Sequence, residues 1–135
     1  MNEEIKSILR KNEGLSLVPY HCPAGKVTIG YGHNLTDNGI PIHIAEQLLD
    51  YDLKQAQKQL FKNYPSYSEF SENRKNALID MVFNIGIVSF KKFKNMHRYL
   101  EIKDFDMAAA EMLNSKYAVD VPKRAGRNAK IIKNG

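Results

Sequence analysis

Three side chains near the N-terminus have types and a spacing that could support catalysis. Eight residues separate Glu13 from Cys22, and five separate Cys22 from Thr28. A glutamate can hold a transferable proton, and a cysteine thiolate is a strong nucleophile. Taken singly, a glutamate is usually a solvated charge, a lone cysteine is more often a small packed hydrophobe, and a threonine in a strand commonly serves packing. The spacing of the set, and no single member, indicates chemistry.

The residues around this set predict a small β-rich lobe over residues 13–41. The segment Glu3–Asn12 has the periodicity of a helix, and Leu15–Tyr20 and Lys26–Tyr31 have the pattern of extended strands. We expect Asn34–Pro41 to be a loop. Turn-forming residues separate the segments: Gly14, Pro23, Gly25, Asn38, Gly39 and Pro41. Glu13 therefore lies where the first helix meets the hairpin.

Helical periodicity dominates the rest of the chain. Apolar residues recur at offsets of three and four in four stretches, and a proline suited to the first helical position indicates a fifth helix. The predicted helices are 42–62, 72–85 with Gly86 as its stop, 89–100, 104–114 with Asp104 as its cap, and one that starts at Pro122. The expected fold is α+β, a single domain over residues 1–135. In it, 13–41 form the β-rich lobe, and 42–135 with 1–12 form the helical lobe.

Composition and charge narrow the possible functions. The 135 residues are 43% hydrophobic and 26% charged, as in ordinary globular proteins, which excludes a disordered tail, a collagen-like repeat and a coiled coil. No apolar run reaches the ~18 residues of a membrane span, and the N-terminus lacks the features of a signal peptide. We therefore expect synthesis in the cytoplasm and no stable membrane insertion. The net charge of +5 favours polyanionic partners such as nucleic acid, anionic membranes or cell-wall polymers.

Longer motifs give the three residues a context. Glu13-Gly14 and Thr28-Ile29-Gly30-Tyr31-Gly32-His33, with Tyr20 and the spacing through Cys22, resemble the phage-type lysozymes of glycoside hydrolase family 24. Two downstream segments, residues 77–86 and 122–127, look like the long core helix and the C-terminal proline-arginine segment of that family. The resemblance implies a lysozyme-like fold with an active cleft between the hairpin lobe and the helical lobe. The short loop after His33 implies a more open cleft than in longer members.

The resemblance also implies roles for single residues. Glu13 matches the general acid that protonates the glycosidic oxygen, Cys22 the second catalytic group, and Thr28 the hydroxyl that places the attacking water. Tyr20 belongs to the same motif and is expected to support the substrate site. Arg124 matches an arginine that approaches the catalytic glutamate.

A further pair is implied by the same resemblance, namely a buried structural contact between His33 and Asp52. We expect His43 and His97 to be surface residues. The run Lys91-Lys92-Phe93-Lys94 and the pair Lys123-Arg124 are expected to form solvated faces. No His, Cys or Asp cluster has metal-ligand spacing, so neither a metal nor a cofactor is expected.

The chemistry at position 22 stays open. Glycoside hydrolysis needs a protonated acid and a second group that supplies or activates a nucleophile. A free thiol is mostly neutral near pH 7 and is a poor base, although its thiolate is a strong nucleophile. Cys22 could attack the sugar, ionise beside basic groups, or hold a water, and the stereochemical outcome depends on which it does. For Glu13, desolvation would favour the protonated acid and a nearby Arg124 would favour the carboxylate.

The implied activity is that of a peptidoglycan muramidase. It would cut the β-1,4 bond between N-acetylmuramic acid and N-acetylglucosamine during lysis of a bacterial host. The enzyme would act as a monomer that reaches the wall through a holin-type lesion. One alternative is an inactive lysozyme fold that binds glycan or a protein partner. Another is a small basic nucleic-acid-binding module, although no recognised nucleic-acid motif is present.

Overall fold

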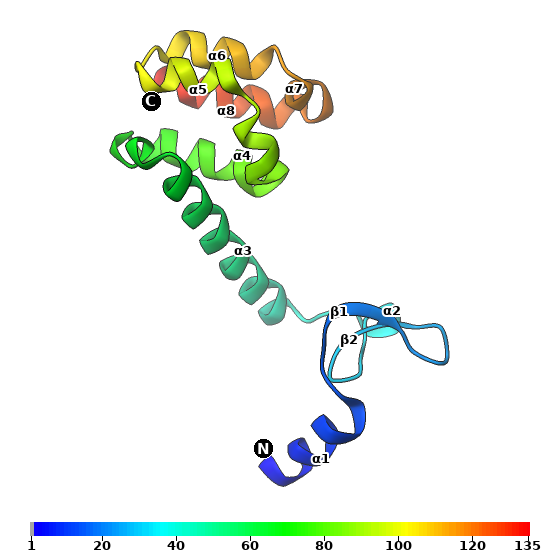
Figure 1. Ribbon diagram of the computed structural model, residues 1–135. Helices are drawn as coiled ribbons and strands as arrows, with labels where there is room; N and C mark the ends of the chain where they lie inside the picture. Colours follow the sequence, from blue (N-terminus) through cyan, green and yellow to red (C-terminus); the bar gives the residue numbers. More distant parts are fainter. Residues whose placement is uncertain (1) are drawn as a thin grey trace. The chain divides into compact units, whose positions relative to one another are not determined.

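The computed structural model describes residues 2–135 and contains two compact units (Figure 1). The first unit ends at Gln47, and the second runs from Leu48 to Gly135. The boundary falls inside one helix, α3 (Ile42–Asn63). The expected grouping of residues 1–12 with the helical lobe stays a prediction. The mixture of helices with one small antiparallel sheet confirms the predicted α+β fold class.

The first unit consists of a helix followed by a three-stranded sheet. Its elements are α1 (Glu3–Glu13), β1 (Ser16–His21), β2 (Val27–Gly30), β3 (His33–Asn34) and α2 (Leu35–Asn38). The side chain of Asn2 caps α1 by accepting the backbone N–H of Glu4 at 2.8 Å. Gly14 ends the helix at a φ of 71°, a conformation that favours glycine. The predicted first helix and its stop are therefore confirmed.

The sheet has the order β1-β2-β3, with both pairs antiparallel. Tyr20 pairs with Thr28, and Ser16 pairs with Gly30, so the register shifts between these two pairs. Pro19 lies inside the irregular stretch. Proline lacks the N–H that a regular ladder needs, so it is tolerated on an edge strand or at a bulge. At the other end of the hairpin, the N–H of Gly25 donates to the carbonyl of Cys22 at 2.8 Å, closing the predicted turn.

The prediction of a loop over residues 34–41 was wrong for its first half. His33 and Asn34 form β3 against β2, and Leu35–Asn38 form the short helix α2. The Asn34 side chain accepts the backbone N–H of Asp37 at 3.0 Å, and the N–H of Gly39 returns to the carbonyl of Leu35. Local hydrogen bonds at its two ends stabilise this short helix. It is too short to show the apolar periodicity from which a helix is predicted.

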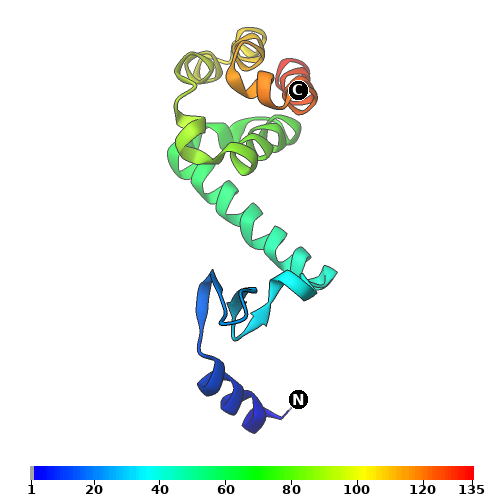
Figure 2. The same cartoon turned by 90° about the vertical axis from the view of Figure 1, so that its right-hand side faces the viewer.

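The second unit is entirely helical. After α3 come η1 (Pro65–Glu69), α4 (Glu72–Lys91), α5 (Lys94–Glu101), α6 (Phe105–Leu113), α7 (Lys116–Asp120) and α8 (Pro122–Asn134). Helix α6 packs against α5 and α8, and α4 packs against α8 (Figure 2). The largest fully buried side chains form one core: Leu60, Tyr67, Leu78, Met81, Phe90, Met96, Leu100, Met112 and Ile132. The predicted cap Asp104 and the start at Pro122 are confirmed.

The helix boundaries between residues 86 and 94 differ from those predicted. Gly86 has non-helical angles (φ 81°, ψ 159°), yet helical structure resumes after it and ends at Lys91. Phe90 therefore belongs to α4, which ends one residue later, and a new helix begins at Lys94. Apolar spacing reports which side chains are buried, and Phe90, Met96 and Leu100 are buried as the spacing indicates. It does not report where the backbone hydrogen bonds break. The short helices η1 and α7 were also missed, because each is too short to show a period.

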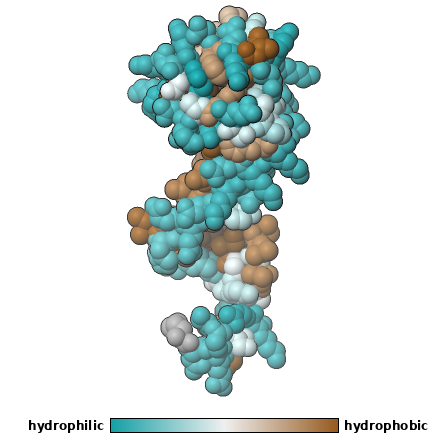
Figure 3. Space-filling view, turned by 90° about the vertical axis from the view of Figure 1, so that its left-hand side faces the viewer, coloured by the Kyte–Doolittle hydropathy of each residue, from teal (hydrophilic) through white to brown (hydrophobic). Residues whose placement is uncertain are grey.

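One face of the helical unit is mostly polar. Figure 3 shows hydrophilic residues over most of its visible face. Within residues 2–135, no helix combines the length and the apolar character that a membrane span requires.

The prediction that His97 lies on the surface was wrong. The side chain is 7% exposed, and its Nε2 donates to the carbonyl of Phe90 at 2.7 Å. Its Nδ1 therefore accepts the Tyr67 hydroxyl at 2.8 Å, which is the arrangement of a neutral imidazole. Tyr64 stacks on the ring with centroids 4.2 Å apart. Burial lowers the pKa of His97, while the carbonyl of Phe90 and the charge of Glu101 act in the opposite direction.

Acidification is expected to destabilise the protein through His97. In the unfolded chain this histidine gains its proton near pH 6.5, whereas the lowered pKa delays protonation in the folded state. Stability is therefore full above about pH 7 and falls as the pH drops through about 6.5, by at most about 1.4 kcal/mol per pH unit. Urea unfolding at several pH values measures the slope. His97→Gln should flatten it, whereas His43→Gln, at an exposed position, should not; equal slopes in all three proteins would contradict the prediction.

Candidate active site

Glu13 is the last residue of α1, at the point where the chain turns into the sheet. Its side chain is exposed in the first unit. A hollow of about 320 Å³ adjoins it, lined by Glu13, Gly14, Leu15, Ser16 and Tyr20. This hollow is large enough for part of a sugar residue and is accessible from solvent. The structure therefore brings two of the predicted site residues, Glu13 and Tyr20, to one concave surface.

Cys22 and Thr28 lie together at the hairpin turn. The backbone N–H of Cys22 donates to the carbonyl of Lys26 at 2.9 Å. The Thr28 hydroxyl donates to the same carbonyl at 3.0 Å, and Thr28 is only 4% exposed. Cys22 itself is half-buried and free. Tyr20 pairs with Thr28 across the strands, so the sheet connects the turn to the hollow beside Glu13.

The turn favours the ionised form of Cys22. The backbone N–H of Lys26 lowers the pKa of the thiol, partial burial raises it, and the N–H of Ala24 and the Thr28 hydroxyl lower it further. The net direction is downward, which increases the thiolate fraction near neutral pH. The Thr28 hydroxyl has one hydrogen, which it donates to the carbonyl of Lys26. It can donate a hydrogen bond to the sulfur of Cys22 only when its bond to that carbonyl breaks.

Helix α2, which the sequence pattern did not reveal, holds the start of β2. The ammonium of Lys26 pairs with Asp37 at 3.1 Å, and the N–H of Val27 donates to the Thr36 hydroxyl at 2.8 Å. These contacts attach the turn that carries Cys22 to a second element. A site on loops needs such support, because binding geometry depends on the rigidity of the surrounding backbone.

The predicted supporting histidine, His33, has a partner within its own unit. It pairs with Ile29 on the neighbouring strand, and its Nε2 donates to the carbonyl of Gly39 at 2.6 Å. This bond connects β3 to the end of α2. Asp52 is an exposed residue of α3 in the second unit, so the His33–Asp52 pair stays a prediction.

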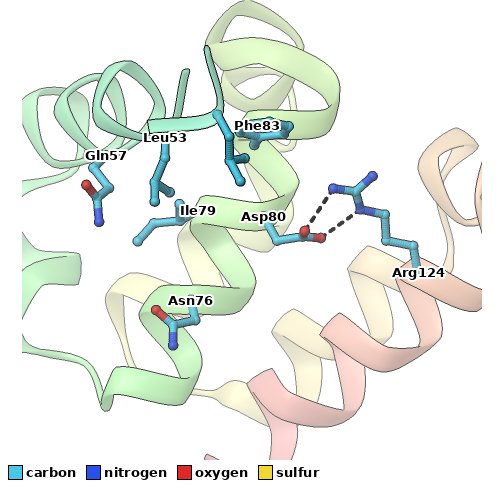
Figure 4. A pocket seen from close by; sticks show the side chains of 8 residues that line it. Leu53, Gln57, Asn76, Ile79, Asp80, Phe83 and Arg124 are labelled. Carbon is cyan, nitrogen blue, oxygen red and sulfur yellow. Dashed lines mark hydrogen bonds and ion pairs between the residues drawn. The ribbon is translucent and has the colours of Figure 1, made fainter. Parts of the chain in front are cut away.

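Arg124 also has a partner within its own unit, which corrects the expectation of a solvated charge. Its Nε and a terminal nitrogen donate to the two carboxylate oxygens of Asp80, each at 2.8 Å. Asn128 donates to the same carboxylate at 2.8 Å and to the Tyr117 hydroxyl at 2.9 Å. The Arg124 and Asp80 side chains are 32% and 39% exposed. Figure 4 shows the guanidinium reaching from α8 to Asp80 on α4.

Asp80 was missed as a functional candidate, although a signal existed. It is an acidic residue within the apolar run Ala77–Phe83 of a core helix, and such a residue usually has a partner when buried. The bidentate bond from Arg124 lowers the pKa of Asp80, burial raises it, and Asn128 lowers it again. Beside this pair is a hollow of about 430 Å³ lined by Leu49, Leu53, Gln57, Asn76, Ile79, Asp80, Phe83 and Arg124 (Figure 4).

Removing the Asp80 carboxylate is expected to destabilise the second unit. Asp80→Ala leaves the guanidinium of Arg124 and the amide of Asn128 without their shared acceptor. We expect a loss of about 1–2 kcal/mol in the free energy of unfolding, the value of charged hydrogen bonds discounted for partial exposure. Chemical denaturation measures it, with Asp50→Ala at an exposed position of α3 as the matched control. Equal stability of the two variants would show that the network contributes nothing.

The structure defines an α+β protein of the lysozyme-like class. It has a helical unit and a hairpin unit, and the hairpin unit presents a carboxyl group, a thiol and a buried hydroxyl. Comparison with known proteins is more specific, since the model of the phage lysozyme family matches residues 10–130. The chain belongs to the phage lysozyme family. The match includes Glu13, Cys22, Thr28 and Arg124.

Relatives carry names that agree with this family. The chain is similar to probable T4-type lysozyme 2 of Dictyostelium discoideum, with 29% identity over 164 residues covering all of this chain and 96% of the relative. Probable T4-type lysozyme 1 of the same organism is 30% identical with the same coverage. An endolysin of Acyrthosiphon pisum secondary endosymbiont phage 1 is 33% identical over 78% of this chain and 73% of the relative. The first alignment exceeds the chain's 135 residues, so the relative has segments that this chain lacks.

Proposed function

We propose that this protein hydrolyses the β-1,4 bond between N-acetylmuramic acid and N-acetylglucosamine in bacterial peptidoglycan, and that this activity serves lysis of a bacterial host. Membership of the phage lysozyme family supports a lysozyme-type glycoside hydrolase. The observation that carries the proposal is the position of Glu13 at the end of α1, beside a solvent-accessible hollow and on the same unit as Cys22 and Thr28.

In the proposed reaction Glu13 is the general acid. Its protonated carboxyl gives a proton to the glycosidic oxygen while the bond from that oxygen to the sugar carbon breaks. The oxocarbenium-like carbon that develops needs a nucleophile on its other face. The lowered pKa of Cys22 supports the thiolate as this second group, acting on the sugar directly or on a water. Thr28, next to Cys22 at the turn, is proposed to place that water.

The supporting roles are proposals of the same kind. Tyr20 lines the hollow beside Glu13 and is proposed to contact the glycan. We also expect, from the family resemblance, contacts of Arg124 with Glu13 and of His33 with Asp52, which would join residues of different units. The same resemblance predicts a cleft between the lobes. Action as a monomer, synthesis in the cytoplasm and release to the wall through a holin-type lesion are further predictions.

The test is to incubate the purified protein with peptidoglycan and to identify the new chain ends by mass spectrometry after borohydride reduction. Cleavage at the proposed bond gives new reducing ends on N-acetylmuramic acid. New reducing ends on N-acetylglucosamine, or anhydro-sugars, would assign a different reaction. Binding without any new ends would favour the inactive glycan-binding alternative.

A further inference from the structure

We infer that Gly32 is a positioning residue for the Glu13 carboxyl group, an inference that rests on the proposed role of Glu13 as the acid. Tyr31 and Gly32 connect β2, which ends at Gly30, to β3, which begins at His33. Tight connections between antiparallel strands commonly place a glycine at a positive φ, and Gly32 has a φ of 71°. The connection presents the backbone of Gly32 to the end of α1.

The Glu13 side chain lies directly against Gly32. A Cβ atom added at position 32 would lie 2.5 Å from Oε2, 2.8 Å from Cδ and 3.2 Å from Cγ of Glu13. The first two distances are shorter than real Cβ contacts, so the side chain at position 13 occupies the space that any residue except glycine would fill. The absence of a side chain at position 32 therefore defines where the carboxyl group of Glu13 can be.

The atoms that would have to move are at the far end of a flexible glutamate. Such a clash is relieved by rotation of the side chain and needs no movement of the backbone. An alanine at position 32 is therefore expected to displace the carboxyl group while the fold persists. A general acid must lie within about 2.6–3.2 Å of the atom that it protonates, and a displacement of about 1 Å can lower a rate about 100-fold.

Gly30 provides a matched control on the other side of Tyr31. Its φ of 69° is almost the same as that of Gly32, so alanine at either position would have the same unfavourable positive φ. A Cβ at position 30, however, would have no heavy atom of the described residues of the first unit within 4 Å, apart from those of its own residue and its two chain neighbours. The two alanine variants thus differ in one respect, the contact with Glu13.

The experiment compares kcat, KM and melting temperature for the full chain and for Gly32→Ala and Gly30→Ala. Both variants should melt within about 3 °C of each other, because the strain is shared. Gly32→Ala should lower kcat about 10- to 100-fold with little change in KM, and Gly30→Ala should retain kcat within about 3-fold. In a Glu13→Gln background the Gly32→Ala change should add little further loss, since coupled residues give non-additive effects. Equal losses in the two glycine variants, or additive losses in the double variant, would overturn the inference.

A second readout does not depend on activity. The side-chain carboxyl ¹³C signal of Glu13, assigned by its disappearance in Glu13→Gln, should move in Gly32→Ala and stay nearly fixed in Gly30→Ala. A protein that cleaves no peptidoglycan would contradict the proposed function, yet this signal would still decide whether Gly32 positions the glutamate. An unchanged Glu13 signal in Gly32→Ala would refute the contact, even in a fully active enzyme.

Discussion

Glu13→Gln is expected to lower the rate of peptidoglycan hydrolysis by about 10²- to 10⁴-fold, the usual contribution of a positioned general acid. Glutamine has nearly the same volume and shape, so the hollow beside Tyr20 keeps its lining. Its amide cannot supply the proton that the leaving oxygen needs. Because Glu13 is exposed in the first unit, the free energy of unfolding should change by no more than about 0.5 kcal/mol.

The control for this variant is Glu4→Gln on the same helix, at another exposed position. It removes an equal charge and should leave kcat unchanged. Release of reducing ends from purified peptidoglycan measures both variants under the same conditions. A Glu13→Gln variant that hydrolyses the polymer at the wild-type rate would remove Glu13 from the role of acid.

The Cys22 variants are expected to give the second large effect. Cys22→Ala deletes the second catalytic group and should reduce kcat severely, by about 10²- to 10³-fold. Cys22→Ser keeps the shape of the side chain, but its hydroxyl does not ionise near neutral pH, so it should be nearly as inactive. Cys22→Asp restores an ionised group and should retain activity within about 10-fold of the wild type.

The pH dependence of activity shows whether the Cys22 thiol must ionise or whether a side chain of the right size at position 22 is sufficient. If the thiolate is the working form, activity rises with pH through the lowered pKa of Cys22. In Cys22→Asp this limb should move to lower pH, because an aspartate ordinarily ionises near pH 3.9. NMR of the first product anomer then shows whether the configuration is retained or inverted. Undiminished hydrolysis by Cys22→Ala, or by the wild type after thiol alkylation, would exclude Cys22 from the mechanism.

Local patterns in the sequence predicted the elements whose ends are set by local chemistry. Gly14 ends α1, the Pro23–Gly25 turn closes the hairpin, and Asp104 caps α6. Each depends on residues a few positions apart, and the spacing of Glu13, Cys22 and Thr28 belongs to the same local segment. Predictions failed where the apolar pattern does not report the structure, as at α2, which is capped by Asn34 and Gly39, and at the helix break between Lys91 and Lys94.

By itself, therefore, the sequence determined the α+β class, the first helix and the hairpin that together carry the three candidate residues, and the family to which these residues point. The tertiary structure alone decided the pairings between distant residues. Asp80 and Arg124 are 44 positions apart, and Tyr67 and His97 are 30 apart. The contact of Gly32 with Glu13 likewise depends on the turn between β2 and β3. Periodicity and capping depend on residues that are close in the sequence. The contacts between distant residues depend instead on how helices and strands pack against one another, which is set only when the chain folds.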